Sequence, residues 1–300
     1  MYIGLSSITI ARQKACKTLE LRRKRNLMYI DILQIRHSEA LVYQQWIGPR
    51  MPPKQTQIDA LVKSKAYSGT VTDAAAKRMR KAISLLIQKS PRQKIFNPVS
   101  NTHHQFSIGF VTLTLVDQGK DSIKEVYSKC LAPFLKWLRY TGVKDYVWKA
   151  ELQVRGTIHY HIAVNKFIHY QILRDKWNLF QKKAGYLNKY AKKHKHFRPN
   201  STDVHAIHKV DKIEAYLCKY LMKGGSGAVA GKVWDCSRNL KDAKYFSTEL
   251  TYQNIDKLRT YCRKEINGEY STIFTLPQGK PALVLSKLQM SEYRKHLLAI

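Results

Sequence analysis

Two histidines flank a tyrosine in the run GTIHYHIAV, residues 156–164, which is otherwise rich in strand-forming residues. Because side chains two positions apart lie on one face of a strand, His159 and His161 should project side by side. Imidazole nitrogens are common ligands of divalent metal ions, so the pair would form one edge of a metal site. The spacing also fits two half-exposed histidines on an ordinary strand, and the pair alone leaves both interpretations open.

A metal site of this kind needs a third ligand, and the strand expected just before the histidines offers two candidates. Glu151 and Gln153 also lie two positions apart and therefore share a face. A strict two-residue turn between the strands would place Leu152 across from His159, whereas a three-residue loop or a bulge near Gly156 would place Glu151 there. The choice of Glu151 therefore depends on the geometry of the turn.

A second group of residues suited to chemistry is the run YLCKYLMK, residues 216–223. Tyr216 and Tyr220 are four positions apart on a predicted helix, so their side chains leave the same face, as do those of Lys219 and Lys223. A phenol has a pKa of about 10 and is a poor nucleophile at neutral pH, but a metal-polarised phosphate and a nearby ammonium would favour its attack. The spacing also fits two core aromatics on an amphipathic helix.

The elements that carry these residues follow the order β-α-β-β-α-β. We expect four strands and two helices, in chain order at 107–116, 121–140, 145–154, 157–164, 169–184 and 202–210. Pro133 should kink or break the first helix, and a last helix at 211–223 carries the tyrosines. This order predicts an α+β fold of the split ferredoxin-like type, with a central antiparallel sheet flanked by helices.

The charge of the chain indicates a polyanionic partner. Fifty-three Lys and Arg against 21 Asp and Glu give a formal net charge of +32, which makes nucleic acid the expected partner. No apolar run is long enough to span a bilayer and the start lacks the features of a signal peptide, so we expect a cytoplasmic protein without a membrane partner. The five cysteines form no C-x-x-C pair, which argues against a zinc knuckle or a disulfide framework.

Three motifs carry a resemblance to a known family. FVTLTL at 110–115, ELQVRGTIHYHI at 151–162 and YLCKYLMK at 216–223 resemble, in this order, the motifs of HUH rolling-circle replication initiators. The two-tyrosine arrangement is similar to that of replication proteins of single-stranded DNA phages of the microvirus type and of related bacterial viruses and plasmids. KVWDCSRNL at 232–240 also resembles a stretch of such phage proteins, so the resemblance covers residues 105–240.

The resemblance implies a set of site residues and a reaction. The implied ligands of Mg²⁺ or Mn²⁺ are His159, His161 and Glu151, with Gln153 as the alternative to Glu151. The implied nucleophiles are Tyr216 and Tyr220, with Lys219 and Lys223 near the phosphate. One tyrosine would nick a single-stranded or extruded origin, forming a 5′-phosphotyrosine link and a free 3′-hydroxyl that primes a host polymerase, and the second would allow the ends to be rejoined. A host helicase would open the duplex, in the cytoplasm of a bacterial host if a phage or plasmid encodes the protein.

These expectations divide the chain into three parts. Residues 1–100 form a basic N-terminal extension with a helix near 72–89, residues 105–240 form the HUH endonuclease domain, and residues 241–300 form a helical C-terminal extension. Basic segments at 22–25, 77–81 and 182–198 are candidate phosphate contacts. The last segment supplies the expected DNA-binding residues Lys182, Lys183, Lys192, Lys193, Lys195 and Arg198.

Two other functions fit parts of this pattern. A non-enzymatic protein could bind single-stranded nucleic acid with the same fold and charge, but it does not explain the joint spacing of the histidine pair, the acidic partner strand and the tandem Tyr-x-x-Lys. A plasmid relaxase or transposase of the same superfamily more often has a single tyrosine or a third histidine, and neither is the pattern here.

Overall fold

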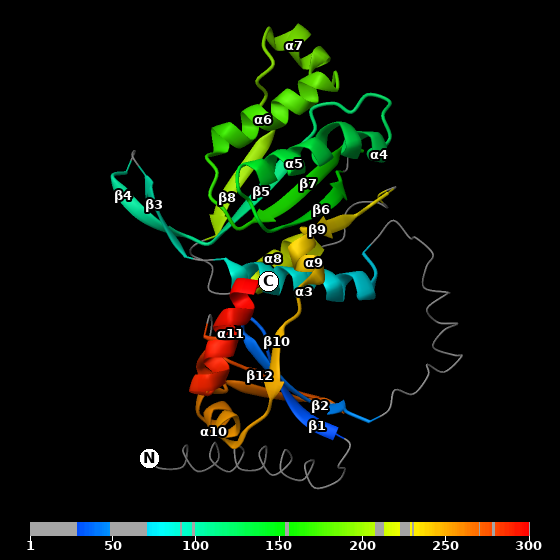
Figure 1. Cartoon of the computed structure of the whole chain (residues 1–300). Coiled ribbons are helices and arrows are strands. Elements are labelled where there is room, and N and C mark those ends of the chain that lie inside the picture. The colour runs from blue at the N-terminus through cyan, green and yellow to red at the C-terminus, as the bar shows by residue number, and fades with distance from the viewer. Residues whose placement is uncertain are drawn as a thin grey trace, which may run out of the picture. The chain divides into compact units, whose positions relative to one another are not determined.

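A computed structural model describes most of the chain, which divides into two compact units formed by residues 1–63 with 244–300 and by residues 64–243 (Figure 1). The described residues are 29–48, 71–90, 92–97, 100–153, 156–207, 213–222, 229, 231–269, 271–277 and 280–299. The structure is α+β, with antiparallel sheets and several helices. In this described part of the chain, no helix has the length and apolar character needed to cross a membrane.

The first unit contains a five-stranded antiparallel sheet that joins the two ends of the chain. Its strand order is β10-β1-β2-β12-β11, with β1 Tyr29–Ile35, β2 Glu39–Trp46, β10 Phe246–Glu249, β11 Lys264–Asn267 and β12 Ser271–Thr275. Helices α10 (Tyr252–Tyr261) and α11 (Lys287–Ala299) and the 3₁₀ turn η2 (Pro281–Val284) contribute to its core. The sequence suggested two separate extensions, whereas the structure pairs strands from both ends in one sheet.

The second unit is built on another five-stranded sheet. Its order is β8-β5-β7-β6-β9 with antiparallel neighbours, and the strands are β5 Ile108–Thr114, β6 Tyr146–Leu152, β7 Ile158–Val164, β8 Thr202–Ile207 and β9 Trp234–Cys236. Each of the four strands expected from the sequence is present with shorter bounds. Because β-branched and aromatic residues alternate along these strands, each strand presents one apolar face to the core.

Helices that connect the strands form the core with one face of this sheet. They are α4 Ile123–Val126, the π-helical turn η1 Tyr127–Leu131, α5 Ala132–Tyr140, α6 Tyr170–Lys183 and α7 Asn188–His194. At the centre, Trp177 packs edge-to-face against both Tyr160 and Phe134, with ring centroids 6.3 and 5.6 Å apart. All three side chains are almost completely buried, so this side of the sheet is closed.

The helix at 121–140 is interrupted as expected, but the interruption lies just before the proline. The N–H of Ala132 donates to the carbonyl of Tyr127, five residues earlier, which is a π-helical turn. Pro133 follows in the first turn of α5. Because proline has no N–H to donate, the local hydrogen-bond pattern changes without ending the helical path.

Helix α3 (Asp73–Lys89) packs against α8 (Ile213–Met222) and β6 within this unit, and α9 (Arg238–Asp242) also contacts it. The Thr72 hydroxyl caps the start of α3 by accepting a hydrogen bond from the Ala75 N–H. At its other end, Lys89 Nζ lies 3.3 Å from the buried carboxylate of Asp145, which also accepts a hydrogen bond from Ser237. These contacts hold α3 to the start of β6. The remaining element is a hairpin of β3 (Gln93–Asn97) and β4 (Thr102–Phe106).

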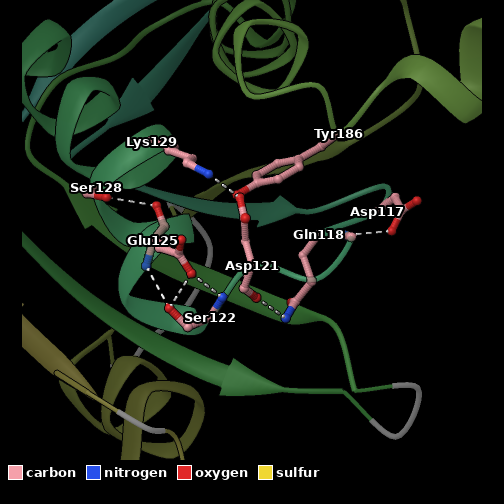
Figure 2. A network of polar contacts seen from close by, with 9 residues as sticks. Asp117, Gln118, Asp121, Ser122, Glu125, Ser128, Lys129 and Tyr186 are labelled. Carbon is pink, nitrogen blue, oxygen red and sulfur yellow. Dashed lines mark hydrogen bonds and ion pairs between the residues drawn. The ribbon is translucent and has the colours of Figure 1, made fainter.

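A polar network fixes the loop after β5 (Figure 2). The Asp121 carboxylate accepts hydrogen bonds from the Tyr186 hydroxyl and from Lys129 Nζ, both at 2.6 Å. Ser122 and Glu125 form a capping box at the start of α4. The hydrogen bonds of Lys129 and Tyr186 lower the pKa of Asp121, so the carboxylate stays charged and ties the loop to both partners.

Candidate active site

The turn between β6 and β7 has the length that places Glu151 beside the histidines. Glu151 is the cross-strand partner of His159. The N–H of Gln153 donates to the carbonyl of Thr157, and the N–H of Gly156 donates to the carbonyl of Gln153, both at 2.9 Å. Gly156 has φ +80°, which only glycine adopts without strain. The connection is therefore a three-residue loop, and the two-residue turn that would have brought Leu152 opposite His159 is excluded.

Both ring nitrogens of His161 have partners. Its Nε2 lies 3.2 Å from a carboxylate oxygen of Glu151, and its Nδ1 lies 3.1 Å from the hydroxyl of Thr112 on the neighbouring strand β5. A carboxylate can only accept, so Nε2 carries the proton and Nδ1 accepts from Thr112. By contrast, Nε2 of His159 is buried and has no hydrogen-bond partner among the described residues.

The electrostatic surroundings favour neutral imidazoles. Burial lowers the pKa of His159, and the neighbouring His161 lowers it further, against an opposing effect of Glu151. Burial also lowers the pKa of His161, although the charge and hydrogen bond of Glu151 act in the opposite direction. Both rings are therefore uncharged at neutral pH, the state in which a histidine can bind a metal ion.

The donor set fits a divalent ion in its chemistry. Two neutral imidazoles and one carboxylate occupy one stretch of the β6–β7 hairpin, and the buried Nε2 of His159 has no partner in the described part of the chain. Gln153 uses its side-chain oxygen within the turn, where it accepts a 2.8 Å hydrogen bond from Thr157. Among the described residues, no three His, Cys, Asp or Glu side chains meet in an arrangement that could hold a metal ion. Glu151 is bonded to His161 instead of pointing with it at a common position.

The tyrosine pair lies on the same face of the sheet as the histidines, and one ring connects the two groups. Phe110 on β5 stacks on His161 with ring centroids 5.6 Å apart and an interplanar angle of 7°. The same ring lies 6.4 Å from Tyr216 and 6.0 Å from Tyr220. The two tyrosine rings are 4.5 Å apart. Two motifs that lie far apart in the sequence therefore meet at Phe110.

The tyrosines do not serve as the core residues of α8. Leu217 and Leu221 are completely buried, whereas Tyr216 is half-buried and Tyr220 is 41% exposed. Burial raises the pKa of Tyr216, and its charge interaction and hydrogen bond with Tyr220 raise it further. Lys219 Nζ lies 6.0 Å from the centroid of the Tyr220 ring. Lys223, expected to act with it, lies outside the described residues.

The expected DNA-binding residues lie on α6, on α7 and just beyond, and all of them are exposed. The sequence suggested a loop at 192–199, but α7 continues to His194 and only the residues from Lys195 on leave the helix. The segment combines charge with aromatic rings, since Lys182 Nζ lies 4.5 Å from the ring centroid of Phe197. The basic segment at 77–81 is part of α3, and that at 22–25 lies outside the described residues.

Three residues of the site were not singled out from the sequence. Phe110 and Thr112 belong to the run FVTLTL, where strand alternation would have placed them on one face. Lys149, the cross-strand partner of His161, has only 2% of its surface exposed, and its positive charge lowers the pKa of His161. Alternation within β6 puts Lys149 and Glu151 on one face, but only the register brings Lys149 opposite His161.

Comparison with known protein families matches the part of the chain that carries the site. The model of a family described as Replication-associated protein ORF2 matches residues 108–225, from the start of β5 to just beyond α8. The match includes both histidines and both tyrosines of the site. No curated protein and no solved structure matches the chain. The similarity supports a family of replication initiators.

Proposed function

We propose that this protein initiates rolling-circle replication by nicking single-stranded or extruded origin DNA through a tyrosine. The observation that carries the proposal is the position of Phe110, which stacks on His161 and also contacts Tyr216 and Tyr220. A pair of metal-ligand candidates and a pair of nucleophile candidates thereby share one face of one sheet. The similarity of residues 108–225 to replication-associated proteins supports the same function.

The topology of the second unit supports an HUH endonuclease domain. Its strands β5, β6, β7 and β8 alternate with helices in the order β-α-β-β-α-β, and they lie in the sheet in the order β8-β5-β7-β6. This is the arrangement expected of a split ferredoxin-like fold. Helices cover the face opposite the site, which leaves the histidine face for a substrate.

In this proposal, His159, His161 and Glu151 hold Mg²⁺ or Mn²⁺. The buried Nε2 of His159, which has no partner among the described residues, and the neutral state of both rings support the assignment. Once bound, the ion would supply positive charge that draws electron density from the scissile phosphate. Glu151 is favoured over Gln153 because the Gln153 side chain is already bonded to Thr157.

The chemical step is a transesterification by a tyrosine hydroxyl. The Oη of one tyrosine attacks the phosphorus, a new O–P bond forms, and the bond from phosphorus to the 3′ oxygen breaks. The phenol gives up its proton and the leaving 3′ oxygen takes one up, so a 5′-phosphotyrosine and a 3′-hydroxyl result. Because Tyr216 has a raised pKa, its proton must leave as the new bond forms. The Lys219 ammonium near Tyr220 would offset the developing negative charge.

The two tyrosines together allow a complete cycle. The link to protein preserves the free energy of the phosphodiester, so the ends can be rejoined without ATP. The 3′-hydroxyl would prime a host DNA polymerase on a strand that a host helicase unwinds. After one round, the second tyrosine cleaves the regenerated origin while the released 3′-hydroxyl attacks the first link. The 4.5 Å separation of the two rings supports such an exchange.

The proposal is tested with 3′-labelled single-stranded oligonucleotides that tile the parent replicon, incubated with Mn²⁺ or with a chelator. We expect one tile to give label that migrates with the protein on a denaturing gel, only without the chelator. The adduct should persist in one single variant, Tyr216→Phe or Tyr220→Phe, and disappear in the double variant. Tyr140→Phe is a matched control, because Tyr140 is 78% exposed and lies on α5. Tight binding of every tile without an adduct would instead favour a non-enzymatic single-strand-binding protein.

A further inference from the structure

The hairpin of β3 and β4 is the element of the second unit that the proposed reaction does not use. It forms a two-stranded sheet that pairs with no other described strand. Figure 1 shows it extending away from the five-stranded sheet of its unit. An isolated two-stranded hairpin is marginally stable in water, so a partner that covers it would also stabilise it.

One face of the hairpin carries four exposed side chains that can contact bases. The cross-strand pairs are Lys94 with Gln105 and Phe96 with His103, and paired residues share a face. All four are exposed, Phe96 by 50% despite its apolar ring. The rings of Phe96 and His103 lie with centroids 5.3 Å apart. We call these four residues the Lys94 face.

The charge around the hairpin is complementary to a polyanion. No Asp or Glu occurs between Asp73 and Asp117, while the same stretch contains basic residues in both α3 and the hairpin. Within the hairpin, the basic groups are Arg92 just before β3 and Lys94. A protein partner with an acidic surface would suit this charge, but the side chains of the Lys94 face suit DNA more closely. Lysine contacts guanine, glutamine contacts adenine, and an aromatic ring can contact the methyl group of thymine.

We propose that the β3–β4 hairpin is a second DNA-binding site, which enters the major groove of double-stranded DNA and contacts base edges through the Lys94 face. The major groove is wide enough for a two-stranded ribbon, and a single strand has no such groove. The inference rests on the proposed function in that its partner is origin DNA. It adds a double-stranded recognition element, such as the stem of an extruded hairpin, next to a site that cleaves single strands. The hairpin also lies before the residues 108–225 that match the family.

The connection to β5 relates this second site to the tyrosines. Phe106 at the end of β4 is buried and packs edge-to-face on Phe167, with centroids 5.5 Å apart. The chain then continues directly into β5, and Phe110 follows four residues later, about 13 Å along a strand. Because Phe110 contacts both tyrosines, a duplex on the hairpin would direct its single-stranded continuation toward the cleavage site.

The test separates binding of duplex from binding of single strands. The full chain carrying Tyr216→Phe and Tyr220→Phe, which cannot form an adduct, is the reference protein. The added substitutions are Lys94→Ala, Phe96→Ala and Gln105→Ala. Two probes are used, a DNA hairpin with a single-stranded 3′ tail from the replicon and the tail alone. We expect the affinity for the hairpin probe to fall by at least about tenfold, as for the removal of one good base contact, with the affinity for the tail unchanged.

Substitutions on the opposite face serve as the matched control. Gln93→Ala with Thr102→Ala changes the same hairpin without touching the Lys94 face, and the affinity for both probes should stay as in the reference. An unchanged affinity of the Lys94-face variant for the hairpin probe would overturn the inference, as would an equal loss for both probes. Failure of the proposed function is recognised separately, as the absence of any adduct when the wild-type protein meets single-stranded tiles.

Discussion

The ring of Phe110 lies parallel to the imidazole of His161, with centroids 5.6 Å apart. This stacking links the histidine strand to the tyrosine helix, because the same ring touches Tyr216 and Tyr220. Phe110 is 3% exposed and carries no reactive group. In the proposed reaction it therefore acts as a positioning residue that sets the distance between the nucleophiles and the metal-ligand candidates.

Phe110→Leu should slow adduct formation more than its effect on stability explains. Leucine retains most of the buried apolar volume, so the free energy of unfolding should fall by no more than about 2 kcal/mol, while the rate of adduct formation should fall by about tenfold because a near-attack geometry is disturbed. Single-turnover kinetics and urea unfolding measure the two effects. Phe134→Leu, on the closed side of the sheet, is the control, and equal losses of rate in the two variants would refute the positioning role.

Glu151→Gln should weaken Mn²⁺ binding by at least about tenfold, because it replaces a carboxylate by a neutral amide next to His161. Titration of Mn²⁺ followed by calorimetry measures the change without depending on cleavage. Gln153→Ala should leave the affinity unchanged, since the Gln153 side chain is used in the turn. A larger loss of affinity in the Gln153 variant would exchange the two assignments.

The stability of the metal-free protein should fall as the pH drops from about 7.5 to about 5.5. The pKa values of His159 and His161 are lowered in the folded state, so the unfolded chain binds more protons once the pH falls below the ordinary value of about 6.5. Their contribution is thus present above this pH and decreases below it. Urea midpoints of the wild type and of the His159→Gln, His161→Gln variant should converge toward low pH, and a difference that grows on acidification would contradict the sign.

Charge reversal on α7 should weaken DNA binding for all sequences alike. Lys192→Glu with Lys193→Glu removes two exposed cations from the expected phosphate-binding segment. The slope of the logarithm of affinity against the logarithm of salt concentration should decrease by about 2, because each phosphate that is no longer neutralised lowers it by about one. Lys264→Glu with Lys287→Glu makes the same change of net charge in the other unit. Equal effects of the two pairs would indicate only a general influence of net charge.

Local sequence patterns determined much of the second unit. Alternation of apolar residues predicted its four main strands, and the spacing of Leu217 and Leu221 made 211–223 a helix whose buried side excludes Tyr220. Alternation also predicts that His159 and His161 share a face. These properties depend on residues two to four positions apart, so they can be derived without knowing the rest of the fold.

Only the tertiary structure decided which faces meet. The pairing of β1 with β10 joins segments from the two ends of the chain, and no local periodicity encodes such a partner. The three-residue loop before Thr157 selected Glu151 over Leu152, because a change of one residue in register moves every side chain to the other face. The meeting of His161 and the tyrosines at Phe110 likewise depends on packing of α8 against the sheet, a long-range interaction that the sequence specifies only through the complete fold.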